Sequence, residues 1–164
     1  MKRSEQDIRF QWDLTKIFPN EAAWEAAMQQ AEAAIDGLKD IPGTLGTSKE
    51  AFKKGLDTIY ASMFKVELPY TYAFLKKTED GSVAENQEMA ARSESLLVKF
   101  SAATAFLNPE ILAIPAEKLD EWMQDEALAT YRHTVDDIVR MRAHTLDAAR
   151  EQMLALLGDA AGTP

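Results

Sequence analysis

Apolar residues recur at steps of three and four along most of the chain, which is the spacing of one face of an α-helix. The first such segment predicts a helix over residues 21–36. Asn20 precedes it and can accept the free amide protons of a first turn. Gly37 follows the last apolar position, so we expect the helix to end there.

A second segment begins after Ser48 and keeps its helical phase as far as Phe74, which predicts one long helix. Pro69 lies inside it and should kink the helix, because its ring clashes with the carbonyl four residues earlier. The polar residues 78–82 predict a turn, and residues 83–107 predict another long helix. We therefore expect these two helices to form an antiparallel hairpin.

Shorter elements follow. Asn108–Pro109 and Pro115 have the order of residues that begins a helix. Residues 128–142 predict a further helix, and Thr145 can cap a last one over residues 146–157.

The pattern predicts an all-α fold, an antiparallel helical bundle with a long helical hairpin and several shorter C-terminal helices. It contains no alternation long enough for a sheet. Trp12, Ile17 and Phe18 lie in a non-helical leader that we expect to dock on the bundle. The expected organisation is one all-helical domain with an irregular leader (1–19), three main helices (20–107), shorter helices (108–158) and a tail (159–164).

Composition agrees with a folded helical protein, since 46% of the 164 residues are hydrophobic and 27% are charged. The net charge of -9 opposes binding to phosphate backbones and anionic lipids, so we expect neither nucleic acid nor membrane as a partner. The chain has no cysteine, no signal-like leader and no run of about 18 apolar residues. These features predict a cytoplasmic protein.

The two histidines bear on metal chemistry. Zinc peptidases commonly place two histidines four residues apart on a helix, with a glutamate between them that takes a proton from the metal-bound water. Here His133 and His144 are eleven residues apart, and Asp137 and Ala148 occupy their i+4 positions. The sequence therefore contains no His-Glu-x-x-His motif.

Other candidate sites are weaker. His133, Asp136 and Asp137 would share one helical face and could hold a divalent ion, but a solvated surface cluster is the simpler interpretation. Residues 43–46 lack the Gly-Lys-Ser/Thr ending that positions a phosphate, and no serine lies in a nucleophile motif. We predict no catalytic, cofactor-binding or metal-binding residue in this chain.

An aromatic series marks the middle of the chain. Its members are Phe52, Tyr60, Phe64, Tyr70, Tyr72 and Phe74. Aromatic residues at helical spacing normally fill the interface between helices, which is the interpretation we favour. The functional alternative is a partly exposed wall that contacts peptide side chains.

Several segments resemble the oligoendopeptidase F-type peptidases in sequence and order. They are Trp12–Phe18 with Trp24, Phe106–Leu112, Tyr131–His133, Arg140–Leu146 and Glu151–Leu154. The resemblance spans nearly the whole chain, and its motifs are structural rather than catalytic.

The resemblance implies an all-α zinc metallopeptidase related to thimet oligopeptidase, whose N-terminal helices line part of a channel that admits short peptides. Zinc would belong to the parent enzyme, and the catalytic domain, absent here, would be this chain's partner. Such a fragment would be inactive alone. It would expose apolar surface and self-associate, as a two-fold dimer. The alternatives are a stand-alone helical protein-interaction module and, third, a bundle that binds a small molecule or metal.

Overall fold

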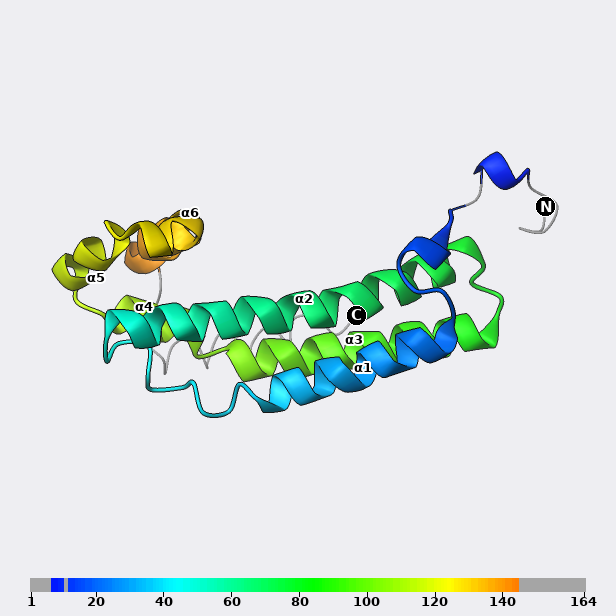
Figure 1. Cartoon of the computed structure of the whole chain (residues 1–164), viewed down its shortest axis with the longest axis horizontal. Coiled ribbons are helices and arrows are strands. Elements are labelled where there is room, and N and C mark those ends of the chain that lie inside the picture. Colours follow the sequence, from blue (N-terminus) through cyan, green and yellow to red (C-terminus); the bar gives the residue numbers. More distant parts are fainter. Residues whose placement is uncertain (1–6, 11, 145–164) are drawn as a thin grey trace. The chain divides into compact units, whose positions relative to one another are not determined.

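The computed structural model describes residues 7–10 and 12–144 of the chain. These residues form helices, turns and loops, and no strand occurs among them, so the all-α prediction is confirmed. The chain divides into two compact units, Met1–Leu107 and Asn108–Pro164, which are described separately (Figure 1). The helix predicted over residues 146–157 and the tail predicted over 159–164 lie outside the described residues.

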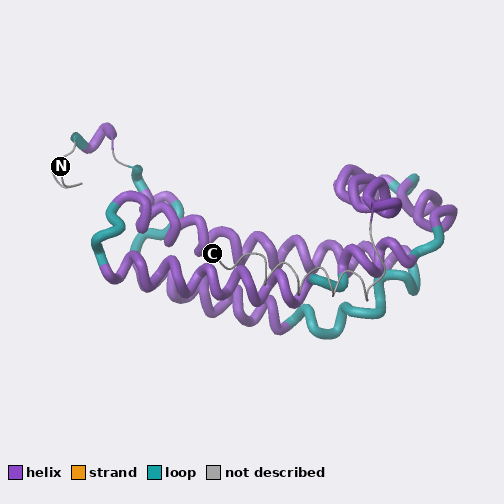
Figure 2. The backbone as a smooth tube through the Cα atoms, turned by 180° about the vertical axis from the view of Figure 1, so that it is seen from behind, coloured by secondary structure: helices purple, strands orange, loops and turns teal. Residues whose placement is uncertain are grey.

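The first unit is a bundle of three helices. They are α1 (Glu21–Asp36), α2 (Lys49–Glu79) and α3 (Ala84–Thr104). α2 and α3 form the predicted antiparallel hairpin, and α1 lies along both of them, as Figure 2 shows from behind. Their shared core includes buried Met28, Ile59, Val66 and Leu96.

Local sequence explains where these helices begin. The side chain of Asn20 accepts the backbone N–H of Ala23 at 2.9 Å, and Ser48 accepts that of Ala51 at 3.1 Å. Each cap satisfies one of the amides that a helix start leaves without an intrahelical partner. The predicted bounds of α1 are confirmed. α3 ends at Thr104, three residues before the predicted end.

Pro69 lies within α2, which is bent but continues as one helix on both sides. Because proline has no amide proton, it cannot donate to the carbonyl of Lys65. The indole Nε1 of buried Trp24 donates to the carbonyl of Pro69 at 2.9 Å. α1 therefore holds α2 at the position where its own hydrogen-bond ladder is interrupted.

The leader is more regular than predicted. It contains two short 3₁₀ helices, η2 (Ile8–Phe10) and η3 (Leu14–Lys16). Phe18 is buried edge-on against Tyr72, with ring centroids 5.3 Å apart. The predicted docking is correct for Phe18 and the partly buried Ile17, whereas Trp12 is more than half exposed.

The second unit contains short helices. They are α4 (Leu107–Ala113), α5 (Ala116–Met123), η4 (Glu126–Tyr131), α6 (Arg132–Arg140) and η5 (Met141–His144). The single helix predicted over residues 128–142 is wrong, since 3₁₀ turns precede and follow α6. The Asp125 carbonyl accepts the amide of Leu128, three residues on, and the Asp125 carboxylate caps Ala127; these contacts start the tighter helix.

One described segment, Ala84–Ala113, is long and apolar enough to cross a membrane by length and composition alone. This is weak evidence, because core helices of soluble proteins pass the same test. Within the segment, Arg92 and Lys99 form ion pairs with Glu25 and Glu32 of α1. α3, which forms most of this segment, is therefore bound to α1 along one side.

Candidate functional site

The outward face of α2 carries an apolar strip. Phe64, Leu68, Thr71 and Phe74 follow one another at steps of four, three and three residues, so they share one face of the helix. Phe64 is 65% exposed, Leu68 37% and Phe74 48%. The ring of half-buried Tyr70 stacks on Phe74, with centroids 6.1 Å apart and planes at 21°. We call Phe64, Leu68, Thr71 and Phe74 the α2 strip.

The aromatic series of α2 does not share one environment. Phe52 and Tyr72 are buried, so the core interpretation is confirmed for them, but it is wrong for the exposed Phe64 and Phe74. At about 100° per residue, the twelve residues between Phe52 and Phe64 leave the two side chains about 120° apart around the helix. The spacing of the series therefore indicates, from the sequence alone, that Phe52 and Phe64 lie on different sides of α2.

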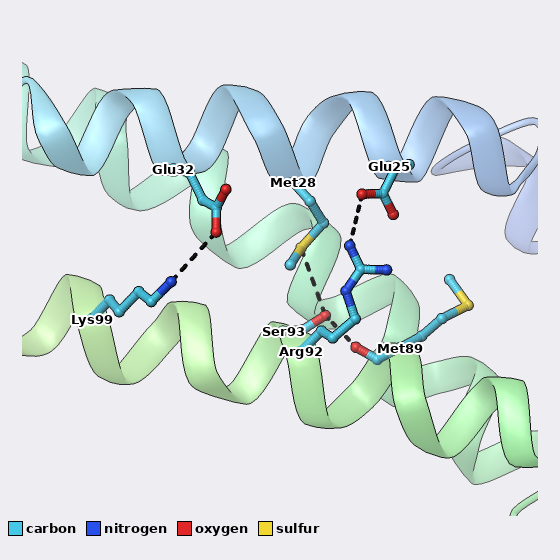
Figure 3. A network of polar contacts seen from close by, with 7 residues as sticks. All are labelled: Glu25, Met28, Glu32, Met89, Arg92, Ser93 and Lys99. Carbon is cyan, nitrogen blue, oxygen red and sulfur yellow. Dashed lines mark hydrogen bonds and ion pairs between the residues drawn. The ribbon is translucent and has the colours of Figure 1, made fainter.

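Ion pairs join α1 to α3, the second helix of the hairpin (Figure 3). Arg92 Nη2 donates to Glu25 Oε1 at 2.7 Å, and its guanidinium lies 5.1 Å from the centre of the Trp24 ring. Lys99 Nζ approaches Glu32 Oε1 at 3.4 Å. The hydrogen bond from Arg92 lowers the pKa of Glu25, and the same bond raises the pKa of Arg92. These contacts fasten α3 to α1.

The hydroxyl of Ser93, next to this network, has a structural role. Ser93 is buried, and its Oγ donates to the carbonyl of Met89 at 2.8 Å and lies 3.9 Å from the sulfur of Met28 (Figure 3). A buried hydroxyl already bonded to a backbone carbonyl is poorly placed to act as a nucleophile. A shallow hollow of about 330 Å³ beside Arg92 is lined by four glutamates and contains no histidine or cysteine.

The candidate metal cluster is an exposed set of charges. His133 Nε2 is 3.5 Å from Asp137 Oδ2, and Arg140 Nη2 donates to Asp137 Oδ1 at 2.9 Å. The side chain of His133 is 90% exposed. Within residues 7–10 and 12–144, no three His, Asp or Glu side chains are grouped closely enough to hold a metal ion.

Known proteins that are similar to this chain come from the family that its sequence segments resemble. A family model described as Oligopeptidase F matches residues 110–164. Oligopeptidase PepF of Bacillus subtilis is 30% identical over 162 residues, which is 98% of this chain. The plasmid oligoendopeptidase F of Lactococcus lactis subsp. cremoris is 29% identical over 164 residues. The resemblance to the N-terminal region of oligoendopeptidase F-type peptidases is confirmed.

A solved structure supports the same relation. The crystal structure of oligoendopeptidase-F from Enterococcus faecium matches 85% of the chain, with a TM-score of 0.73 and 28% sequence identity. The chain spans only about a quarter of the length of these proteins: 24% of the Bacillus protein, 27% of the Lactococcus protein and 27% of the Enterococcus chain. These relatives are therefore much longer than this chain.

Proposed function

We propose that this chain is the non-catalytic N-terminal helical part of a zinc metallo-oligoendopeptidase that hydrolyses short peptides. The observation that carries the proposal is similarity to proteins named oligoendopeptidase F or oligopeptidase over 98–99% of the chain. The partner that this proposal requires is the remaining polypeptide of the parent enzyme, which would contain the catalytic domain.

The residues of this chain do not fit the zinc ion that the family implies. His133 and His144 are its two histidines, and their separation of eleven residues cannot place both imidazoles on one metal from adjacent helical turns. We therefore assign no step of peptide hydrolysis to this chain. Its role in the parent enzyme would be to shape the space in which peptides bind.

We assign the α2 strip to the wall of that space. Exposed aromatic rings next to aliphatic side chains give a surface that binds apolar side chains of peptides without requiring one sequence. The rise of 1.5 Å per helical residue places Phe64 and Phe74 about 15 Å apart along the axis, the length of roughly four or five residues of an extended peptide. The strip could contact two or more side chains of one oligopeptide.

Inactivity of the isolated chain is the first test. Purified protein, dialysed against zinc and then washed, should contain no stoichiometric zinc and should not cleave a quenched fluorescent oligopeptide. An oligopeptidase of the same family, assayed in parallel, supplies the positive control. Chelator-sensitive turnover that co-purifies with the chain would contradict the proposal.

Contact with peptides is the second test. A photoreactive benzoylphenylalanine at position 64 should capture a short peptide that contains aromatic residues. The same group at exposed Lys65, next to the strip on α2, serves as the matched control. Equal capture at both positions would remove the strip from the proposed wall.

The exposed strip also favours a second candidate function, a stand-alone module that binds another helical surface.

In the isolated chain we expect the same strip to drive self-association as a two-fold dimer. Sedimentation should show dimers that the double variant Phe64→Ser/Phe74→Ser abolishes and that Lys65→Ser leaves intact. A monomer at all concentrations would contradict self-association. The cytoplasmic location stays a prediction.

A further inference from the structure

A hollow of about 490 Å³, lined by both polar and apolar residues, lies between the end of α1 and the beginning of α2. One wall is the loop that joins these helices, drawn in cyan in Figure 1, and the other is the first three turns of α2. Its lining includes Gly37, Asp40, Thr44, Thr47, Lys54 and Thr58. Its volume is within the range of small-molecule sites, roughly 300–1,000 Å³.

The loop wall is built firmly. Successive turns are closed by the amides of Ile41, Thr44 and Thr47, each at 3.0–3.1 Å from the carbonyl three residues earlier. Leu45 is fully buried and anchors the loop on α2, where a side chain at Gly55 would place its Cβ 2.3 Å from Leu45 Cδ2. The hollow is therefore formed before any ligand arrives, which reduces the ordering cost of binding.

The lining of the hollow includes one acidic and one basic side chain, Asp40 and Lys54. Asp40 lies beyond the C-terminus of α1, and Lys54 lies in the second turn of α2. Neither side chain has an ion-pair partner within the described part of the chain. The helix dipoles have the same signs at these places, because the C-terminus of α1 is partially negative and the N-terminus of α2 is partially positive.

Three threonines of the lining, Thr44, Thr47 and Thr58, have hydroxyls whose protons are already used. Thr44 Oγ1 donates to the carbonyl of Ile41 at 2.6 Å, Thr47 Oγ1 to that of Thr44 at 2.7 Å, and Thr58 Oγ1 to that of Lys54 at 2.7 Å. A hydroxyl has one proton and two lone pairs. With the protons already used, the remaining lone pairs suit a ligand that donates hydrogen bonds.

We propose that this hollow binds small zwitterions of the dipeptide class. The ammonium group lies toward Asp40 and the threonine oxygens, and the carboxylate lies toward Lys54 and the start of α2. The volume leaves room for two side chains beyond the charged ends. This inference goes beyond the proposed function and does not depend on it, because the site needs neither zinc nor a catalytic domain.

The test uses the whole chain and the dipeptide Ala-Leu in three forms. Titration followed by amide NMR shifts should show binding of the dipeptide with free termini, with the largest shifts within residues 37–58. Blocking the amine by acetylation or the carboxylate by amidation should each weaken binding about tenfold or more. Free alanine separates a single amino acid from the dipeptide and should bind at least several-fold more weakly.

Variants that neutralise one charge test which residues contact the charged groups of the dipeptide. Asp40→Asn and Lys54→Met should each weaken binding about tenfold. Glu67→Gln and Lys65→Met change the net charge by the same amounts at exposed positions of α2 outside the hollow, and should leave the affinity within about twofold. Equal binding of free and blocked dipeptides, absence of binding, or equal losses in all four variants would overturn the proposal. The blocked dipeptides test it on the unmodified protein, so the proposal stays falsifiable even if a variant fails to fold.

Discussion

The two faces of α2 are both rich in apolar side chains, yet only one is buried. In the core shared with α1 and α3 the helix presents residues such as Ile59 and Val66, neither of them more than 3% exposed. On the outward face Phe64 and Phe74 remain largely accessible. The difference arises from angular position around the helix and not from hydrophobicity. An apolar residue is buried only where a neighbouring element reaches it.

The strongest way to sharpen this comparison is to truncate a residue on the inner side. Trp24→Ala removes a buried ring and the donor to Pro69, and should cost about 3–5 kcal/mol of unfolding free energy. Trp24→Phe keeps most of the packing and loses the hydrogen bond, so it should cost about 1–2 kcal/mol. Urea unfolding followed by circular dichroism measures both. Losses below about 1 kcal/mol for Trp24→Ala would show that α1 is not firmly held.

Gly55 tests how tightly the inner side of α2 meets the loop after α1. Gly55→Ala should gain about 1 kcal/mol of helix propensity but lose about 1–3 kcal/mol through the clash with buried Leu45, a net loss near 1 kcal/mol. Gly81→Ala, whose Cβ would lie 3.4 Å from the Lys77 carbonyl, is the control with little expected change. Thermal unfolding measures both. A stabilised Gly55→Ala would show that the loop gives way.

The pair between Glu25 and Arg92 should have a smaller effect, since both side chains are partly exposed. Glu25→Gln should cost about 0.5 kcal/mol at pH 7. Because folding lowers the pKa of Glu25 below its ordinary value of 4.5, this stabilisation is fully present above that value and is lost as pH falls through the folded pKa. Wild type and variant should therefore converge in acid. A difference that persists unchanged below pH 3 would assign the effect to packing.

The outward face should show the smallest effect on stability. Phe64→Ala should change the unfolding free energy by no more than about 0.5 kcal/mol, because the ring is 65% exposed and alanine favours helix. The same urea titration at low protein concentration gives the value. A loss above about 2 kcal/mol would mean that something covers the α2 strip and would break the comparison.

Much of the fold could be predicted because its signals are local. Asn20 and Ser48 mark helix starts through side chains that reach their own first turns. The start of α6 is harder to predict. Its first residue, Arg132, donates to the Met123 carbonyl nine residues away, a contact that helical periodicity does not encode. The hydrogen bond from Trp24 to Pro69 joins residues 45 apart, and no local pattern encodes it.

The candidate site could be predicted less completely. The aromatic series is evident in the sequence, but which members are exposed depends on where α1 and α3 lie around α2, and the favoured core interpretation fails for Phe64 and Phe74. The hollow near Lys54 has no sequence signal, because the path of the loop brings Asp40 and Lys54 to one place. Residues 43–46 by themselves indicate only a turn.

The hydrogen bond at Pro69 also limits how the long helix can be studied. A synthetic peptide of residues 49–79 would retain the proline and its missing amide but would lose the indole that holds this point in the intact bundle. The part from Pro69 to Glu79 would then have to form helix by itself. It is shorter than the roughly 12–15 residues that are marginally helical alone in water. We therefore expect the continuity of α2 across Pro69 to depend on α1.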